Sequence, residues 1–147
     1  MKEGDKAPDF QGINELGEQV SLSDYKDKKL VLYFYPKDMT PGCTWQACNL
    51  RDEYSELKKA GYEILGVSPD SEARHQKFIG KHDLPFHLIA DTEKVIAKAY
   101  GVWGLKKFMG REYMGIKRTT FIIENGVITK IISKVKTKAH AAQILGE

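Results

Sequence analysis

The sequence predicts an α/β fold in which a central mixed β-sheet is flanked by helices, and three observations support this. A continuous apolar run at residues 30–35 has the β-forming composition of a strand that is buried on both faces. Strand-like and helix-like segments alternate after it, as they do in βαβ units. Two β-rich segments are then separated by Asn125 and Gly126, a strong signal for an antiparallel hairpin. We therefore expect parallel and antiparallel strands in one sheet.

The first part of the chain is expected to hold a hairpin, the central strand and a long helix. Residues 10–21 predict an N-terminal hairpin, and Pro36 closes the central strand because proline cannot continue a strand ladder. Residues 41–60 predict a helix, which Gly61 is placed to end. The apolar residues at helical spacing in this segment are Ala47, Leu50, Tyr54 and Leu57.

The middle of the chain repeats the alternation of strand and helix. Residues 62–67 predict a strand, residues 71–81 a helix and residues 87–90 a short strand. Asp91 is expected to cap a further helix that Gly101 ends. This part adds an inserted helix-strand-helix segment between the second strand and the later hairpin.

The last part of the chain predicts an antiparallel hairpin and a final helix. The hairpin strands are residues 119–124 and 127–133, and the helix starts near Thr137 and turns its apolar residues inward. Strand, helix, strand, then helix, hairpin and helix is the element order of a thioredoxin-like fold. The chain has 147 residues and no Gly/Ser/Pro-rich linker, so we expect residues 1–147 to form one domain.

Composition excludes several classes of protein. With 41% hydrophobic and 29% charged residues, the chain matches soluble globular domains and differs from disordered or coiled-coil chains. Its apolar runs are far shorter than the roughly 20 residues of a membrane span, and its polar start is unlike a signal peptide. We expect a soluble, cytoplasmic protein with no membrane partner. The net charge of +3 names no partner by itself.

Cys43 and Cys48 are the only cysteines in the sequence. Two cysteines are too few for a secreted disulfide scaffold, and cytosolic thiols stay reduced unless they are catalytic or sense redox state. Thr40 is a suitable helix N-cap and Pro41 suits the first helical position, so Cys43 falls in the first helical turn. Free backbone N–H groups and the helix dipole favour a thiolate there, and the thiolate is the nucleophilic form. Alternatively, Cys43 is a small core residue on the apolar helix face, but the second cysteine favours redox chemistry.

Other candidate sites carry weaker signals. The histidines His75, His82, His87 and His140 lack metal-ligand spacing, so we expect them to be surface or structural residues and expect no metal. Glycine-rich nucleotide loops are missing, and we expect no cofactor. Basic and aromatic residues alternate in residues 106–118, as on nucleic-acid surfaces. We interpret this segment as a solvated loop and expect no nucleic-acid partner.

Residues 33–52, YFYPKDMTPGCTWQACNLRD, are similar to the active-site segment of peroxiredoxins of the bacterioferritin comigratory protein (PrxQ) subfamily. Residues 4–10, 66–68 and 111–121 extend the resemblance over nearly the whole chain. The Pro-x3-Thr-x2-Cys pattern alone is moderately specific. It is strong here because it follows a strand and is accompanied by the later Arg-Thr-Thr-Phe segment.

The resemblance implies roles for five residues. Cys43 matches the peroxidatic cysteine, Thr40 and Arg118 match the residues that hold the peroxide oxygens and the thiolate, and Pro36 matches the residue that shields the site. Cys48 matches the resolving cysteine of many members, which implies an intramolecular disulfide. The resemblance also implies thioredoxin as the external reductant.

The position of Arg118 also follows from topology. A helix that follows a parallel strand begins at the carboxyl end of that strand, and an antiparallel strand starting at Thr119 begins at the same edge. Arg118 therefore has a route to Cys43, where its positive charge would stabilise a thiolate. The alternative is a surface ion pair, and Arg51, Arg111 and Lys117 compete for the role.

The sequence thus predicts a thiol peroxidase that reduces hydrogen peroxide and organic hydroperoxides to water or alcohols, in antioxidant defence and redox homeostasis. The Cys43 thiolate would form a sulfenic acid, Cys48 would condense with it, and an external dithiol would reduce the disulfide. We expect the protein to act as a monomer. One alternative is a general thiol-disulfide oxidoreductase, although its motifs have two residues between the cysteines rather than four. The other is a binding module that uses the basic segment.

The cysteine spacing predicts motion. In a regular α-helix, residues five apart have Cα atoms roughly 8.7 Å apart. A disulfide needs less than about 7 Å. If Cys43 and Cys48 both lie on the helix in the reduced protein, the disulfide requires that the first turns unwind.

Overall fold

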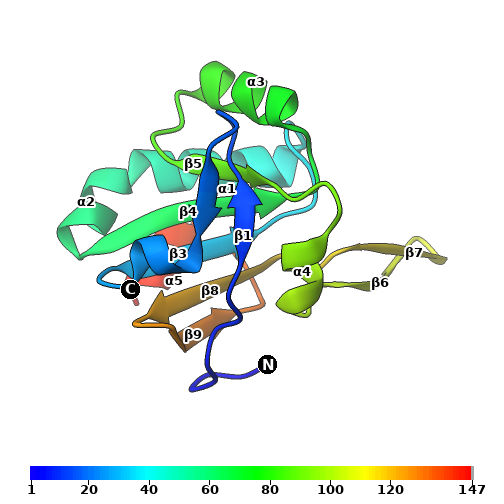
Figure 1. Cartoon of the computed structure of the whole chain (residues 1–147). Coiled ribbons are helices and arrows are strands. Elements are labelled where there is room, and N and C mark those ends of the chain that lie inside the picture. The colour runs from blue at the N-terminus through cyan, green and yellow to red at the C-terminus, as the bar shows by residue number, and fades with distance from the viewer. Residues whose placement is uncertain (147) are drawn as a thin grey trace.

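A computed structural model describes residues 1–146, and its centre is a five-stranded sheet in the order β5-β4-β3-β8-β9 (Figure 1). The strands are β3 (Lys29–Phe34), β4 (Tyr62–Ser68), β5 (His87–Ala90), β8 (Thr119–Glu124) and β9 (Val127–Ile132). β4 runs parallel to β3 and β5, whereas β8 runs antiparallel to β3 and β9. The predicted mixed sheet and the thioredoxin-like element order are confirmed.

Helices and a small hairpin cover the two faces of this sheet (Figure 1). The helices are α1 (Pro41–Asp52), α2 (Tyr54–Lys59), α3 (Glu72–His82), α4 (Val95–Ala99), α5 (His140–Leu145) and the 3-10 helix η1 (Leu22–Tyr25). The predicted N-terminal hairpin is present as β1 (Gln11–Ile13) and β2 (Gln19–Ser21). Residues of α1, α2, α3 and α5 pack on one face, and α4 and the N-terminal segment pack on the other.

The alternation along β3 explains its continuous apolar sequence. Leu30, Leu32 and Phe34 are fully buried in the cluster beneath the N-terminal segment and α4. Val31 and Tyr33 point to the opposite cluster, against α1 and its neighbours. Successive strand residues point to opposite faces, so a strand covered on both sides must be apolar at every position. β3 is therefore the rigid support from which the following loop and α1 start.

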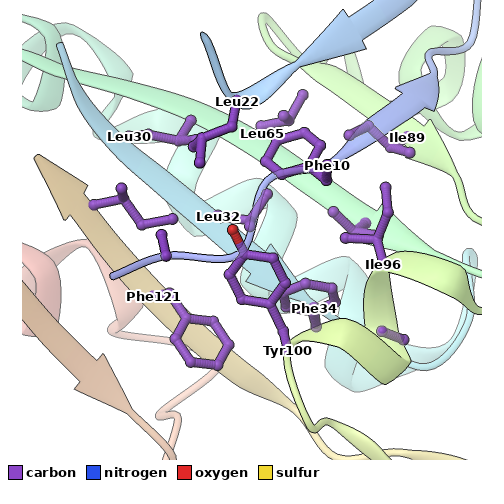
Figure 2. Packing of buried hydrophobic residues seen from close by; sticks show 14 of the residues in the cluster. Phe10, Leu22, Leu30, Leu32, Phe34, Leu65, Ile89, Ile96, Tyr100 and Phe121 are labelled. Atoms are coloured by element: carbon purple, nitrogen blue, oxygen red, sulfur yellow. The ribbon is translucent and has the colours of Figure 1, made fainter. Parts of the chain in front are cut away.

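Aromatic rings hold the N-terminal segment and α4 to the sheet (Figure 2). Phe34 meets Phe121 edge-on with ring centroids 5.8 Å apart, and Tyr100 meets Phe121 at 5.2 Å. The Tyr100 hydroxyl donates a hydrogen bond to the Pro8 carbonyl at 2.7 Å. Each such buried side chain contributes about 1.5–3 kcal/mol through burial, so this cluster fixes the N-terminal segment and α4 on the face away from α1.

The long helix predicted for residues 41–60 is wrong in one respect, because it is broken at Glu53. The backbone of Glu53 has φ −100° and ψ 11°, outside the helical region, and separates α1 from α2. Leu50 and Leu57 nevertheless pack in the same cluster. The apolar spacing therefore continues through the break and gives no sign of it.

The prediction of a solvated loop over residues 106–118 is also wrong. The segment forms an antiparallel hairpin of β6 (Trp103–Phe108) and β7 (Arg111–Ile116) that projects from the body of the molecule (Figure 1). Its turn, Met109 and Gly110, has φ +52° and +80°. Such turns usually carry Asn-Gly or Asp-Gly, and the methionine hid the signal.

Smaller differences concern helix starts. The N-cap position of α4 is Lys94 and not the predicted Asp91, but the Asp91 carboxylate still accepts hydrogen bonds from Ile96 N at 3.2 Å and Ala97 N at 2.9 Å in the first turn. The helix itself begins later, at Val95. α5 likewise begins at His140, three residues after the predicted start near Thr137. Over residues 1–146, none of the helices has the length and apolar character needed to cross a bilayer.

Candidate active site

Cys43 lies in the first turn of α1, directly beyond the carboxyl end of β3. Thr40 is the N-cap with extended backbone (φ −87°, ψ 153°), and Pro41 occupies the first helical position, as predicted. The Cys43 side chain is 2% exposed and packs in the cluster on the α1 face. The residue is thus both a core residue and a helix N-terminal thiol, so the two interpretations left open by the sequence describe one position. Its location favours the thiolate through the helix dipole.

Arg118 approaches Cys43 from the start of β8, as the topology predicted. Its Nη2 lies 3.3 Å from Cys43 Sγ, and its Nη1 donates a 2.6 Å hydrogen bond to Gln46 Oε1. A Cβ at Gly42 would lie 3.2 Å from Arg118 Nη2, so glycine gives the guanidinium room beside the helix. A permanent positive charge at this distance favours the charged form of the sulfur. Gln46, buried on α1, was not identified from the sequence as a residue that fixes Arg118.

The competing basic residues take other positions. Arg51 pairs with Asp52 at 2.9 Å and also donates to the His82 carbonyl at 2.8 Å. Arg111 is exposed on the projecting hairpin. Among these candidates, Arg118 alone makes hydrogen-bond contact with Cys43 within residues 1–146.

The loop between β3 and α1 contains Pro36 and Thr40. Both side chains are half-buried. The Thr40 hydroxyl donates to the Lys37 carbonyl at 2.8 Å, and in the described part of the chain it makes no capping hydrogen bond to the helix. The hydroxyl oxygen thus keeps its lone pairs at the helix N-terminus beside Cys43.

Asp38 anchors the middle of this loop through buried hydrogen bonds that the sequence did not predict. Its carboxylate accepts from the Tyr35 hydroxyl at 2.6 Å and bonds His75 Nδ1 at 2.6 Å, and both Asp38 and His75 are fully buried. Its backbone N–H donates to Asp70 at 2.7 Å, and its carbonyl accepts from Arg74 at 3.3 Å. The remaining nitrogen of His75 bonds the Ile89 carbonyl at 2.9 Å.

This anchoring holds a strained residue in place. Met39, between Asp38 and Thr40, has φ +65°, a left-handed conformation that costs a non-glycine residue about 1–2 kcal/mol. Such conformations persist where the surroundings fix the neighbouring residues. The fixed Asp38 therefore sets the course of the chain into the N-cap at Thr40.

One feature of the sequence could have identified His75 as a buried residue of α3. It recurs with Phe78, Ile79 and His82 at helical spacing, which places a polar ring on the apolar face of α3. His75 proves to be structural and buried, and His140 is also buried, bonding Thr120 Oγ1 at 2.8 Å. His87 lies half-exposed with Nδ1 2.7 Å from Glu15 Oε2. These positions fit the expected surface or structural roles.

Asp38, Asp70 and His75 are also residue types that bind metals, and their ligand atoms lie within 4.8 Å of one another. Each of these residues already has hydrogen-bond partners: Asp70 Oδ2 accepts from Asp38 N and from the Ser68 hydroxyl at 2.7 Å, and His75 bonds Asp38 directly. The arrangement is explained as a hydrogen-bond network.

The buried network gives a stability prediction. His75→Ala leaves the Asp38 carboxylate buried without its imidazole partner, and removing one member of a buried pair typically costs about 3–5 kcal/mol. His87→Ala is the control, because it removes a half-exposed ring and leaves the buried Glu15 carboxylate its 3.1 Å hydrogen bond from Leu88 N, so the loss should be smaller. Urea unfolding measures both. An equal loss of unfolding free energy in the two variants would contradict a special role for the buried pair of Asp38 and His75.

Tyr33, on β3, belongs to the same buried cluster as Cys43. Its ring is 1% exposed, and among residues 1–146 its hydroxyl has no hydrogen-bond partner. Burial, with smaller contributions from Asp38 and Cys43, raises the pKa of Tyr33 well above its usual value. The phenol therefore stays neutral and adds no competing negative charge beside the sulfur.

Cys48 lies on the same helix as Cys43, and both carry free thiols. Cys48 is half-buried, and its Sγ lies 3.7 Å from Nδ1 of His82, the last residue of α3. A regular helix separates the two Cα atoms by roughly 8.7 Å, so the structure is that of the reduced protein. The condition for the predicted unwinding, both cysteines on one helix, is met.

Comparison with known proteins agrees with this arrangement. The AhpC/TSA family matches residues 3–131. The chain is 53% identical over 143 residues to peroxiredoxin Bcp of Bacillus subtilis, covering 97% of this chain and 91% of the relative. It is 44% identical over 146 residues to peroxiredoxin Bcp of Escherichia coli, covering 99% and 94%.

Solved structures of PrxQ proteins are also similar to the structure of this chain. A cysteine-to-serine mutant of PrxQ from Xylella fastidiosa superposes with a TM-score of 0.92 at 31% identity, covering 99% of this chain and 94% of that one. Peroxiredoxin Q of Xanthomonas campestris gives 0.87 at 36% identity, covering 93% and 87%. The chain therefore belongs to the AhpC/TSA family and, within it, to the Bcp (PrxQ) peroxiredoxins, which are thiol peroxidases.

Proposed function

We propose that this thiol peroxidase reduces hydrogen peroxide and organic hydroperoxides at Cys43. The observation that carries the proposal is the 3.3 Å contact between Arg118 Nη2 and the buried sulfur of Cys43. The thiolate attacks one peroxide oxygen, the O–O bond breaks, and water or an alcohol leaves while Cys43 becomes a sulfenic acid. The bacterioferritin comigratory protein of Xanthomonas campestris, 35% identical, is described with alkyl peroxide reduction activity, which supports the wider substrate range.

Three further residues have proposed roles at this step. Arg118 stabilises the thiolate and the negative charge that develops on the departing oxygen. The Thr40 hydroxyl, at the N-cap, holds the peroxide oxygen near the sulfur. Pro36 shields the thiolate from bulk water at the entrance of the loop.

Cys48 has the proposed role of resolving cysteine. Its thiolate attacks the Cys43 sulfenic sulfur, the S–O bond breaks, and water leaves as the disulfide forms. Both cysteines lie on one helix of one chain, which favours an intramolecular disulfide. The first turns of α1 must unwind for this reaction, because a disulfide needs Cα atoms less than about 7 Å apart.

Thioredoxin, or a similar dithiol, is the proposed reductant of that disulfide. We also propose that the protein acts as a cytoplasmic monomer and that residues 1–147 form one domain. The monomer is supported by the contact of Arg118 with Cys43 and by the position of Cys48 on the same helix, neither of which needs a second chain. Both core clusters also share the same central sheet.

A coupled assay separates this function from its alternatives. With thioredoxin, its reductase and NADPH, the protein should consume hydrogen peroxide with multiple turnovers. A thiol-disulfide oxidoreductase would instead reduce insulin disulfides and leave peroxide intact, and a binding module would do neither. Insulin reduction without peroxide consumption would overturn the proposal.

Arg118→Met should slow the oxidation of Cys43 by about 10²–10³-fold, the usual effect of removing one charge-stabilising donor. Thr40→Val should also slow this step, since it removes the hydroxyl at the N-cap. Arg111→Met is the matched control, because that arginine is exposed on the hairpin. Stopped-flow Trp fluorescence measures the rates. An unchanged oxidation rate in Arg118→Met would assign the electrostatic role to another residue.

A further inference from the structure

His82 faces Cys48 from a different helix and has no part in the cycle described so far. Cys48 Sγ lies 3.7 Å from His82 Nδ1, within hydrogen-bond distance for sulfur. The histidine ends α3, and its ring packs edge-on against Phe78 with centroids 5.4 Å apart. Its carbonyl accepts the 2.8 Å hydrogen bond from Arg51 of α1. Backbone and ring are thus both fixed, and the imidazole is held toward the thiol.

The charges around this pair keep the imidazole of His82 unprotonated and favour a thiolate on Cys48. Burial, and then the positive charges of Lys81 and Arg51, lower the pKa of His82 below its ordinary 6.5, while Asp83 opposes them. The imidazole is therefore neutral at pH 7 and able to accept a proton. Arg51, three residues after Cys48 on α1, feels the charge of the Cys48 sulfur, and its guanidinium stabilises a thiolate formed there.

We propose that His82 is the general base that removes the thiol proton of Cys48 when the disulfide forms, an inference that rests on the proposed resolving role of Cys48. Nδ1 of His82 takes the proton, and the Cys48 thiolate attacks the Cys43 sulfenic sulfur. The S–S bond forms, the S–O bond breaks, and the leaving hydroxide becomes water with the proton that His82 took up and now releases. A thiol and a sulfenic acid are thereby converted into a disulfide and water, with no other oxidant or reductant.

The contact between Cys48 and His82 can persist while α1 unwinds, because the end of α1 near Cys48 is bonded to neighbouring helices and the first turn is not. Near Cys48, Arg51 is bonded to the His82 carbonyl, and Asn49 Oδ1 accepts a 2.8 Å hydrogen bond from Ala141 N of α5. The first turn begins with the exposed Pro41 and lacks a side-chain cap within the described residues. Unwinding from the first turn therefore carries Cys43 toward a Cys48 that stays beside its base.

The first arm of the test measures the reactivity of the Cys48 thiol beside His82 in a protein that cannot run the catalytic cycle. Alkylation of Cys48 by iodoacetamide is followed against pH in the Cys43→Ser protein, with and without His82→Gln. Loss of the base should lower the rate of alkylation at pH 7 by roughly tenfold, because no neighbouring group then accepts the thiol proton. His82→Phe keeps the packing against Phe78 and should give the same loss of rate, whereas His87→Gln, the same change at a distant half-exposed ring, should give none.

The second arm measures disulfide formation in the two-cysteine protein after rapid addition of one equivalent of hydrogen peroxide. In the His82 variants this step should be slower by roughly 10²-fold, the lower end of the range for a positioned general base. The unsubstituted protein should lose rate as the pH falls through the lowered pKa of His82 and the imidazole becomes protonated, and the variants should lack that dependence.

The two arms separate this inference from the proposed function. Equal disulfide rates and equal alkylation profiles with and without His82 would overturn the inference while leaving the cycle intact. If the unsubstituted protein forms no Cys43–Cys48 disulfide, the resolving role of Cys48 fails instead. In that case the alkylation arm still shows whether His82 activates the Cys48 thiol.

Discussion

Replacing Cys43 by serine is expected to abolish peroxide reduction. A serine hydroxyl has no accessible anion at neutral pH, so neither the helix N-terminus nor Arg118 can generate a nucleophile from it. The two side chains are nearly isosteric, and the 2% exposed site should accept serine without loss of the fold. The coupled peroxide assay measures the effect, and circular dichroism checks the fold.

Cys48→Ser is the matched control for this loss. It removes the other thiol of the same helix, yet it should still reduce one equivalent of peroxide, because Cys43 and Arg118 are untouched. It should then lose its rapid recycling by thioredoxin and accumulate the sulfenic and sulfinic forms of Cys43. Continued turnover in Cys43→Ser would mean that another group carries the peroxidase reaction.

Oxidation is expected to unfold the first turns of α1. Cα atoms roughly 8.7 Å apart in a helix cannot be joined by a disulfide. The bonds that complete the site, from Arg118 to Cys43 and to Gln46, must then break, so the site exists only in the reduced protein. Amide exchange should rise between residues 41 and about 50, and far-UV helicity should fall. Trp45, on the same helix with Lys138 4.3 Å above its ring, should change its fluorescence.

The exchange experiment has an internal control in the same molecule. Amides of β3 lie at the centre of the sheet and should keep their protection in both redox states. Unchanged protection across residues 41–50 in the disulfide form would show that the disulfide closes without local unfolding.

Features that depend on neighbouring residues in the chain could be predicted from the sequence. The boundaries of β5, the hairpin at Asn125 and Gly126, and the start of α1 at Pro41 all match. These features depend on local propensity and turn chemistry, which nearby residues determine. Strand topology gave Arg118 a route to Cys43, since helix α1 and strand β8 begin at the same edge of the sheet, but it left Arg51, Arg111 and Lys117 as alternatives.

Contacts between distant buried polar groups could not be predicted in the same way. Asp38 and His75 are 37 residues apart, and Cys48 and His82 are 34 apart. Each contact depends on how α3 packs against the α1 side of the sheet, and periodicity alone does not give that packing. The break at Glu53 was missed for a related reason, because tertiary packing preserves the apolar spacing across it.

The most direct test of the catalytic cycle is the intact mass of the protein after one equivalent of hydrogen peroxide, with and without thioredoxin and its reductase. We expect a monomer that has lost two hydrogens, a peptide map joining Cys43 to Cys48, and return to the reduced mass once the thioredoxin system is added. Cys48→Ser should instead gain one oxygen at Cys43. A disulfide that joins two chains, or an unsubstituted protein that stops at the oxygen adduct, would contradict the account.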